Sequence, residues 1–370
     1  MHRALFPLFA LSWACGPRLE PLDLPDDPAA QGAPVGVRTY DLEGLTLEVW
    51  YPAAEEVAGS DGELVDADPF VPAAVVDLLG GVDLPPISSY AVRDAALRNT
   101  GEPLPVVLFS HGFGGFRTQS IDYTQHLASR GYVVVAPDHP GRMMGDILPC
   151  MFDNLVADCN VDLDDPGEDD LPDALDVVES WNTELDGFFE GRLALDGVGL
   201  AGHSAGGMST ASVGDVDLRF TALMPMTTDG SLTRDVPVLY AVGSCDATVP
   251  VAESAEAFAL IPDGRWLTLT GAGHLSPTNL CDLDLGGFAE TLLAPRDDVS
   301  SVWLDQLVGL ATDGCPQDPP QLAHDDCADA YWPLDESQAA LRHYATVFFD
   351  QQLLGRGSLV DAGLVGAVLE

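Results

Sequence analysis

The chain has 370 residues, of which 59 are acidic and 15 basic, so its formal net charge at pH 7 is −44. All of the basic residues are arginine. A negative field of this size repels nucleic acids and anionic membrane surfaces, which excludes both as the main binding partner. A hydrophobic share of 46% excludes disorder over most of the length, and we expect one large globular domain.

The N-terminus is typical of a targeting segment. A short basic start is followed by the apolar run Ala4–Ala14, which is too short to cross a bilayer as a helix. Cys15 follows a small residue, as at the cleavage site of a bacterial lipoprotein. The sequence therefore predicts a signal peptide over 1–15, Cys15 as a lipidation candidate that would form a membrane tether, and a flexible Pro/Asp/Gly-rich segment over 16–37. We expect an exported protein, either a bacterial cell-envelope lipoprotein or a secreted or periplasmic protein.

The other cysteines support export. An even number of cysteines in an exported chain indicates disulfides. Nearest-neighbour pairing predicts Cys150–Cys159, Cys245–Cys281 and Cys315–Cys327. The alternative is a set of buried free thiols in a cytoplasmic protein.

Strands and helices alternate along the rest of the chain. This alternation predicts an α/β fold with a mostly parallel central sheet and helices on both faces. A β-hairpin is expected over 37–51, and the helix at 119–130 should be amphipathic. The other expected strands cover 105–110, 132–136, 198–201, 220–224, 236–243 and 266–270, and the expected helices cover 72–79, 89–99, 119–130, 171–185 and 339–353.

The expected domain covers 38–356, and a C-terminal tail follows at 357–370. The domain carries insertions at about 53–103, 139–172 and 275–335, and connections of this length suggest a cap beside a functional site. The acidic run at 162–170 half resembles a calcium loop, but Pro166 stands at a ligand position, so we favour a solvated loop. We expect neither a metal nor a cofactor.

The most informative motif is Gly202-His203-Ser204-Ala205-Gly206, which lies between an apolar run and small residues that open a helix. A strand, a tight turn and a helix around Gly-x-Ser-x-Gly form a nucleophile elbow, which makes Ser204 a candidate nucleophile. The alternative is a glycine-rich turn with an ordinary serine.

Candidates for the acid and the base follow in the chain order Ser, Asp, His. Asp246 comes directly after a buried strand, and His274 comes after a strand and a glycine-rich turn. His274 would take the serine proton, and Asp246 would orient the imidazole. We interpret His111 and His203 as structural, with His203 pointing away from the serine.

Two backbone amides should form an oxyanion hole. One is that of Ala205, directly after the nucleophile, and the other is that of Phe113 in the glycine-rich loop after strand 105–110. Phe113 and Phe116 are also candidates for the wall of the substrate pocket, unless one of them belongs to the core.

Four segments resemble the platelet-activating-factor acetylhydrolase-like branch of the α/β-hydrolases, which includes many bacterial proteins labelled predicted dienelactone hydrolase. They are Leu47–Ala53, Leu108–Arg117, Gly202–Gly207 and Gly271–Cys281. The resemblance runs from about Arg38 to about Gly355. It implies the α/β-hydrolase fold, a triad of Ser204, Asp246 and His274, and oxyanion amides at Phe113 and Ala205. True dienelactone hydrolases use a cysteine nucleophile, whereas position 204 is serine.

The sequence thus predicts an exported serine hydrolase that cleaves carboxylic esters, either short-chain or acetyl esters and including lipid-derived ones. Its partner would be the small-molecule ester. Two alternatives stay open: a non-catalytic hydrolase-like binding protein, and the same fold acting as a lipase, polyesterase or acyltransferase.

Overall fold

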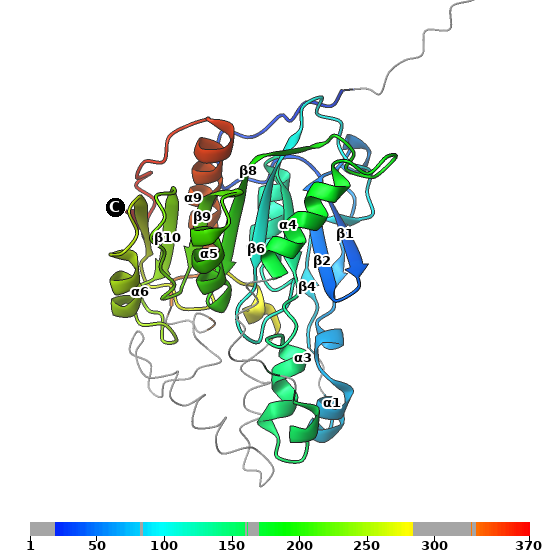
Figure 1. Cartoon of the computed structure of the whole chain (residues 1–370), viewed down its shortest axis with the longest axis vertical. Coiled ribbons are helices and arrows are strands. Elements are labelled where there is room, and N and C mark those ends of the chain that lie inside the picture. Colours follow the sequence, from blue (N-terminus) through cyan, green and yellow to red (C-terminus); the bar gives the residue numbers. More distant parts are fainter. Residues whose placement is uncertain (1–18, 82–83, 160, 162–169, 284–326, 328–330) are drawn as a thin grey trace, which may run out of the picture.

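The computed structural model of the protein describes residues 19–81, 84–159, 161, 170–283, 327 and 331–370 (Figure 1). In this part of the chain ten strands form one sheet, in the order β12-β11-β10-β9-β8-β6-β7-β2-β1-β5. These strands are β1 (Val35–Leu42), β2 (Leu45–Pro52), β5 (Val92–Arg93), β6 (Leu104–Ser110), β7 (Val133–Pro137), β8 (Leu193–His203), β9 (Phe220–Met226), β10 (Val238–Gly243), β11 (Gly264–Leu269) and β12 (Ala367–Leu369). A small second sheet pairs β3 (Leu64–Val65) with β4 (Ile87–Ser88).

The described helices cover both faces and one end of the main sheet. The α-helices are α1 (Ala73–Leu79), α2 (Ile121–Ser129), α3 (Met144–Ile147), α4 (Asp170–Trp181), α5 (Ala205–Val216), α6 (Val251–Phe258) and α9 (Leu334–Leu354). The 3₁₀ helices are η1 (Glu55–Val57), η2 (Asp68–Phe70), η3 (Leu148–Met151), η4 (Val156–Asp158) and η5 (Leu280–Leu283).

The centre of the sheet is parallel, antiparallel pairs flank it on both sides, and the edge strand β5 runs parallel to β1. Neighbouring strands from β11 to β7 run parallel, whereas β2 pairs antiparallel with β7 and with β1. Parallel strands have both faces covered, which explains why β6 is buried along its whole length. The mostly parallel α/β fold expected from the sequence is confirmed.

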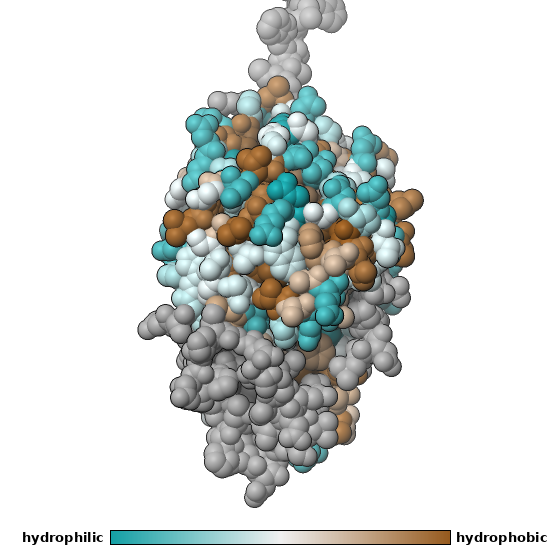
Figure 2. Space-filling model, turned by 90° about the vertical axis from the view of Figure 1, so that its left-hand side faces the viewer, coloured by the Kyte–Doolittle hydropathy of each residue, from teal (hydrophilic) through white to brown (hydrophobic). Residues whose placement is uncertain are grey.

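Alternating side chains of each strand pack into two cores, one on each face of the sheet. In β6, Val107 and Phe109 join the core that contains residues of α2 and α9, whereas Val106 and Leu108 join the core that contains residues of α4 and α5. Figure 1 shows α4 and α5 in front of the sheet and α9 behind it, with α1 and α3 together at one end. On the face drawn in Figure 2, hydrophilic and hydrophobic residues are interspersed.

Three expectations about secondary structure are corrected. The helix expected at 89–99 is absent, because Val92–Arg93 pairs with β1 and Leu97 forms a bridge with Ala53. The helix expected at 119–130 is α2, whose polar side does not face solvent as that of a surface amphipathic helix would, because α2 lies between the sheet and α9 and is buried except at Asp122. The C-terminal tail is part of the domain, since β12 extends the sheet beside β11.

Residues 19–34 pack along the domain, so the flexible segment expected over 16–37 is wrong for this stretch. The buried guanidinium of Arg98 donates to the carbonyl of Glu20 at 2.8 Å. Arg130 donates to two carbonyls farther along the segment at 3.1 and 3.2 Å. A proline-rich stretch lacks amide donors for strand pairing, but its carbonyls still accept hydrogen bonds, and arginine supplies the donors.

Several expectations concern residues outside the described part of the chain. They are the signal peptide at 1–15 with Cys15, the acidic run at 162–169, Cys315, and most of the insertion at 275–335. No helix among the described residues is long and apolar enough to cross a membrane.

Buried neutral histidines make the stability of this fold depend on pH. Burial, reinforced by nearby arginines, lowers the pKa of His111 and of His126 to about 3. Burial also holds the pKa of His139 and of His203 well below the ordinary 6.5. Between the folded pKa and 6.5, the unfolded chain therefore binds more protons than the folded one. The stabilisation from keeping these histidines neutral is complete above pH 6.5. Below pH 6.5, each histidine lowers the unfolding free energy by up to about 1.4 kcal/mol per pH unit.

We expect the unfolding free energy, measured by urea denaturation, to fall between pH 7.5 and pH 5. His126 is a suitable test position, since its Nε2 faces the carbonyl of Pro28 and the hydroxyl of Thr346. A glutamine there supplies a neutral donor, so His126→Gln should lower the slope of this decline by up to one proton. An unchanged slope in this variant would show that His126 is not kept neutral by the fold.

Candidate active site

Ser204 occupies a sharp turn between β8 and α5. Its backbone has φ 56° and ψ −121°, a strained conformation for a residue with a side chain. Its amide donates to the carbonyl of Met226 at 2.9 Å, which holds the turn against β9. A methyl group at Gly202 would collide with the carbonyl of Gly206, and one at Gly206 with that of Ser110. The glycines of the motif therefore allow the close approach that a nucleophile elbow needs.

His274 and Asp246 form a buried pair at the same edge of the sheet. His274 Nδ1 lies 2.9 Å from Oδ2 and 3.1 Å from Oδ1 of Asp246. The carboxylate is fixed by the amides of Thr248 and Val249, which donate to its Oδ1 at 2.8 and 2.7 Å. A carboxylate accepts the proton of Nδ1–H, which leaves Nε2 of the neutral imidazole as an acceptor. This is the tautomer that a general base for serine requires.

His203 contacts the proposed base. The ring centroids of His203 and His274 are 4.8 Å apart, and His203 Nε2 lies 2.9 Å from the carbonyl oxygen of His274. The amide of Gln119 faces Nδ1 of His203 at 3.1 Å, so Nδ1 accepts and Nε2–H donates to His274. His203 directly precedes Ser204, and the contact therefore brings His274 beside the turn that carries Ser204. His203 is buried and both of its ring nitrogens have partners, which fits the structural role expected for it.

The loop after β6 lies against the elbow. A Cβ at Gly112 would sit 2.8 Å from Nδ1 of His203 and 3.2 Å from Cβ of Ser204. Within the described part of the chain, the amide of Phe113 has no hydrogen-bond acceptor. Ala205 is the first residue of α5, and the first amides of a helix lack partners inside it. The two amides expected to form an oxyanion hole are thus both available beside Ser204.

The two phenylalanines of this loop have different surroundings. Phe113 is 43% exposed, so its ring is free to meet a substrate. Phe116 is fully buried and stacks on Phe70 with ring centroids 4.3 Å apart. Phe116 is therefore a core residue, and the expectation that it lines a pocket is wrong. Met208, one helical turn after Ser204, is a further apolar side chain that is 45% exposed, and a methionine in a helix carries no sequence signal of its own.

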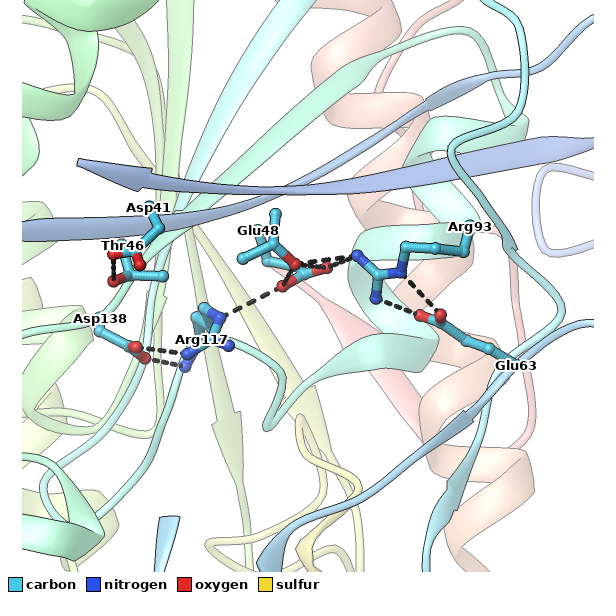
Figure 3. A network of polar contacts seen from close by, with 8 residues as sticks. Asp41, Thr46, Glu48, Glu63, Arg93, Arg117 and Asp138 are labelled. Atoms are coloured by element: carbon cyan, nitrogen blue, oxygen red, sulfur yellow. Dashed lines mark hydrogen bonds and ion pairs between the residues drawn. The ribbon is translucent and has the colours of Figure 1, made fainter. Parts of the chain in front are cut away.

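Arg117, which follows this loop, anchors it to the sheet (Figure 3). Its amide and its Nη1 donate to Asp138 at 2.8 and 2.5 Å, and its Nε donates to buried Glu48 at 3.2 Å. Glu48 also accepts from Arg93, which pairs with Glu63. This row of alternating charges joins the loop, β2 and the insertion at 53–103.

The disulfides only partly follow the expected pairing. Cys150–Cys159 forms as predicted, but Cys281 pairs with Cys327, so Cys245–Cys281 and Cys315–Cys327 are wrong. Cys245 is also disulfide-bonded. The loops that carry Asp246 and His274 are joined by hydrogen bonds instead. The amide of Cys245 donates to Ala272 at 2.9 Å, and the amide of Gly271 donates to the Ser244 hydroxyl at 2.8 Å.

Residues 38–144 match the family model described as platelet-activating factor acetylhydrolase, isoform II. The platelet-activating factor acetylhydrolase of Bos taurus is 29% identical over 107 residues, which are 27% of this chain and 24% of that protein. The match thus spans about a quarter of the length of this relative. The model match contains the loop of Phe113 and ends before Ser204, Asp246 and His274.

The solved structure of a ferulic acid esterase from Streptomyces cinnamoneus is similar over nearly the whole chain. The TM-score is 0.55 at 22% sequence identity, and the alignment covers 91% of this chain and 96% of that one. At this identity, the likeness concerns the fold.

Proposed function

We propose that the chain is a serine hydrolase of the platelet-activating factor acetylhydrolase-like type and that it cleaves carboxylic esters. The observation that carries the proposal is the buried His274–Asp246 pair next to a serine held at φ 56°. Backbone strain at a single polar residue is typical of functional sites.

The reaction we propose proceeds through an acyl-enzyme. His274 Nε2 takes the proton of Ser204 while Oγ attacks the ester carbonyl carbon. The carbonyl oxygen becomes an oxyanion that accepts hydrogen bonds from the amides of Phe113 and Ala205. The intermediate collapses, and the alcohol leaves with the proton from His274. Water, activated by His274, then attacks the acyl-enzyme and releases the acid.

Two exposed apolar side chains support a substrate with apolar or aromatic groups close to the ester. Phe113 belongs to the loop beside the nucleophile, and Met208 lies one turn into α5. The name of the sequence relative, an acetylhydrolase, supports an ester bond rather than an amide. We therefore propose short-chain or acetyl esters as the substrates.

Export of the protein is part of the same proposal. The Cys150–Cys159 and Cys281–Cys327 disulfides support an oxidising compartment, since disulfides are rare in the reducing cytosol.

The proposal is tested with p-nitrophenyl esters of increasing acyl length, followed by a fluorophosphonate that reacts with activated serines. We expect fastest turnover of the acetyl or butyryl ester, and an adduct on the peptide that contains Ser204. Turnover that rises towards long acyl chains would indicate a lipase. The absence of both turnover and adduct would favour the non-catalytic binding protein.

A further inference from the structure

Arg142, in the segment between β7 and α3, carries a buried charge close to the proposed site. Only 2% of its surface is exposed. Its Nη1 donates to the Ser209 hydroxyl at 2.9 Å, and its Nη2 donates to the Ser110 hydroxyl at 2.8 Å and to the carbonyl of His111 at 3.0 Å. A guanidinium stays charged in proteins, so its burial is costly unless a built environment compensates it.

Arg142 forms hydrogen bonds to the loop of Phe113 on both sides of that residue. The guanidinium of Arg142 holds the carbonyl of His111, two residues before Phe113. The carbonyl of Arg142 accepts from the amide of Gly114, the residue after Phe113, at 2.8 Å. Arg142 alone thus holds the Phe113 peptide, which carries the first proposed oxyanion amide, on both of its sides.

The same side chain reaches the second oxyanion segment. Ser209 accepts from Arg142 and donates its own proton to the carbonyl of Ala205 at 3.1 Å. The first turn of α5, which carries the amide of Ala205, is therefore linked to the Phe113 loop through a single guanidinium.

A directed chain of hydrogen bonds leads from this cation to an anion. The carboxylate of Asp170 accepts from His139 Nδ1 at 2.9 Å. Burial holds the pKa of His139 well below its ordinary value, so the ring is neutral and its Nε2 accepts the Ser110 hydroxyl proton at 2.9 Å. The Ser110 oxygen accepts in turn from Arg142. Ser110 and His139 are completely buried, so this Ser–His–Asp arrangement is not a second nucleophilic site. It connects the carboxylate at the start of α4 to Arg142 through neutral groups.

We propose that Arg142 is a positioning residue of the oxyanion hole, held in place by the chain of Ser110, His139 and Asp170. It fixes the spacing of the two segments that carry the Phe113 and Ala205 amides, and it places a positive charge behind them. Preorganised donors of this kind act on the charge that develops in the transition state. The proposal rests on the proposed ester hydrolysis at Ser204.

The test compares Arg142→Met, Arg142→Lys and the control Arg234→Met. Arg234 also uses its guanidinium to hold backbone, since it donates to the carbonyls of Gly214, Asp217 and Phe220 at the far end of α5. It is thus matched in chemistry and in the helix that it supports. All rates are normalised to the folded fraction, measured by circular dichroism.

We expect Arg142→Met to lower kcat for p-nitrophenyl acetate about 100-fold or more, with KM nearly unchanged, because an oxyanion interaction exists only in the transition state. The affinity for a trifluoromethyl ketone, which binds serine as an oxyanion, should fall by a similar factor. Arg142→Lys keeps the charge but not the planar fork, so it should recover part of the rate. A loss in Arg142→Met no larger than in Arg234→Met, or an unchanged ketone affinity, overturns the proposal.

Hydrogen–deuterium exchange of the peptide 111–116 measures the positioning without any turnover. Exchange should rise in Arg142→Met and stay at the wild-type level in Arg234→Met. Should Arg142→Met not fold, Arg142→Lys decides by the same readouts. A wild-type protein without esterase activity would refute the proposed function, whereas wild-type exchange of this peptide in the Arg142 variants would refute the positioning role.

Discussion

Replacing Ser204 with alanine is expected to lower kcat for p-nitrophenyl acetate about 10⁶-fold, the size of effect found when a serine hydrolase loses its nucleophile. Without Oγ no acyl-enzyme forms, and only the hydrogen bonds of the oxyanion hole remain to accelerate attack by water. The fold should persist, because the amide of residue 204 still donates to Met226 and the side chain is only half-buried.

The matched control is Ser212→Ala. Ser212 lies on α5, the helix that Ser204 precedes, and within the described ranges its hydroxyl bonds only to the backbone carbonyls of Met208 and Ser209. The measurement is the burst and steady-state release of p-nitrophenol, with thermal unfolding as the test of structure. If Ser204→Ala retains the activity of Ser212→Ala, the nucleophile lies elsewhere.

Replacing Asp246 with asparagine should lower kcat about 10⁴-fold, because a neutral amide no longer enforces the Nδ1–H tautomer or stabilises the imidazolium. The loop should keep its structure. In the wild-type protein the amides of Thr248 and Val249 donate to Oδ1 of Asp246, and the asparagine oxygen can accept the same two hydrogen bonds. The effect should therefore appear in kcat with little change in the melting temperature.

Asp215→Asn is the matched control for this substitution. The carboxylate of Asp215 also accepts from two backbone amides, those of Thr233 and Arg234 at 2.9 and 2.7 Å, and among the described residues it accepts from no imidazole. It should keep wild-type kcat. A rate in Asp246→Asn within tenfold of the control would mean that another group orients His274.

The elements of the proposed site were predictable because each follows a recognisable apolar strand. In a parallel sheet the carboxyl ends of the strands meet at one edge, so Ser204 after β8, Asp246 after β10 and His274 after β11 had to lie close together. The glycines around them allow backbone segments to come close together, and their spacing can be recognised in a single sequence. The order of the residues along the chain and the tightness of the turns were therefore sufficient.

What the sequence could not supply were contacts between segments that are remote along the chain. Cys281 pairs with Cys327 rather than with Cys245 because η5 packs near the start of α9, where Gln338 donates to the carbonyl of Thr278 at 2.7 Å. Spacing along the chain carries no information about that approach.

The chain from Arg142 to Asp170 was hidden for a related reason. Its members are a serine at the end of a strand, a histidine and an arginine in a connection, and an aspartate among many acidic residues. Each of them has an ordinary surface interpretation on its own. Only the fold brings them into one chain of hydrogen bonds, buried except at Asp170.

The packed N-terminal segment has a consequence for the orientation of the molecule. Leu19 lies beside Gly101, just before β6 begins, whereas the loop of Phe113 follows the end of that strand. Seven residues of extended chain separate these edges by roughly 20 Å. If a lipid is attached at Cys15, four residues allow a reach of at most about 14 Å to Leu19. The bilayer would then lie under the amino ends of the strands, and Ser204 would open towards the surrounding solution rather than towards the lipids that hold the protein.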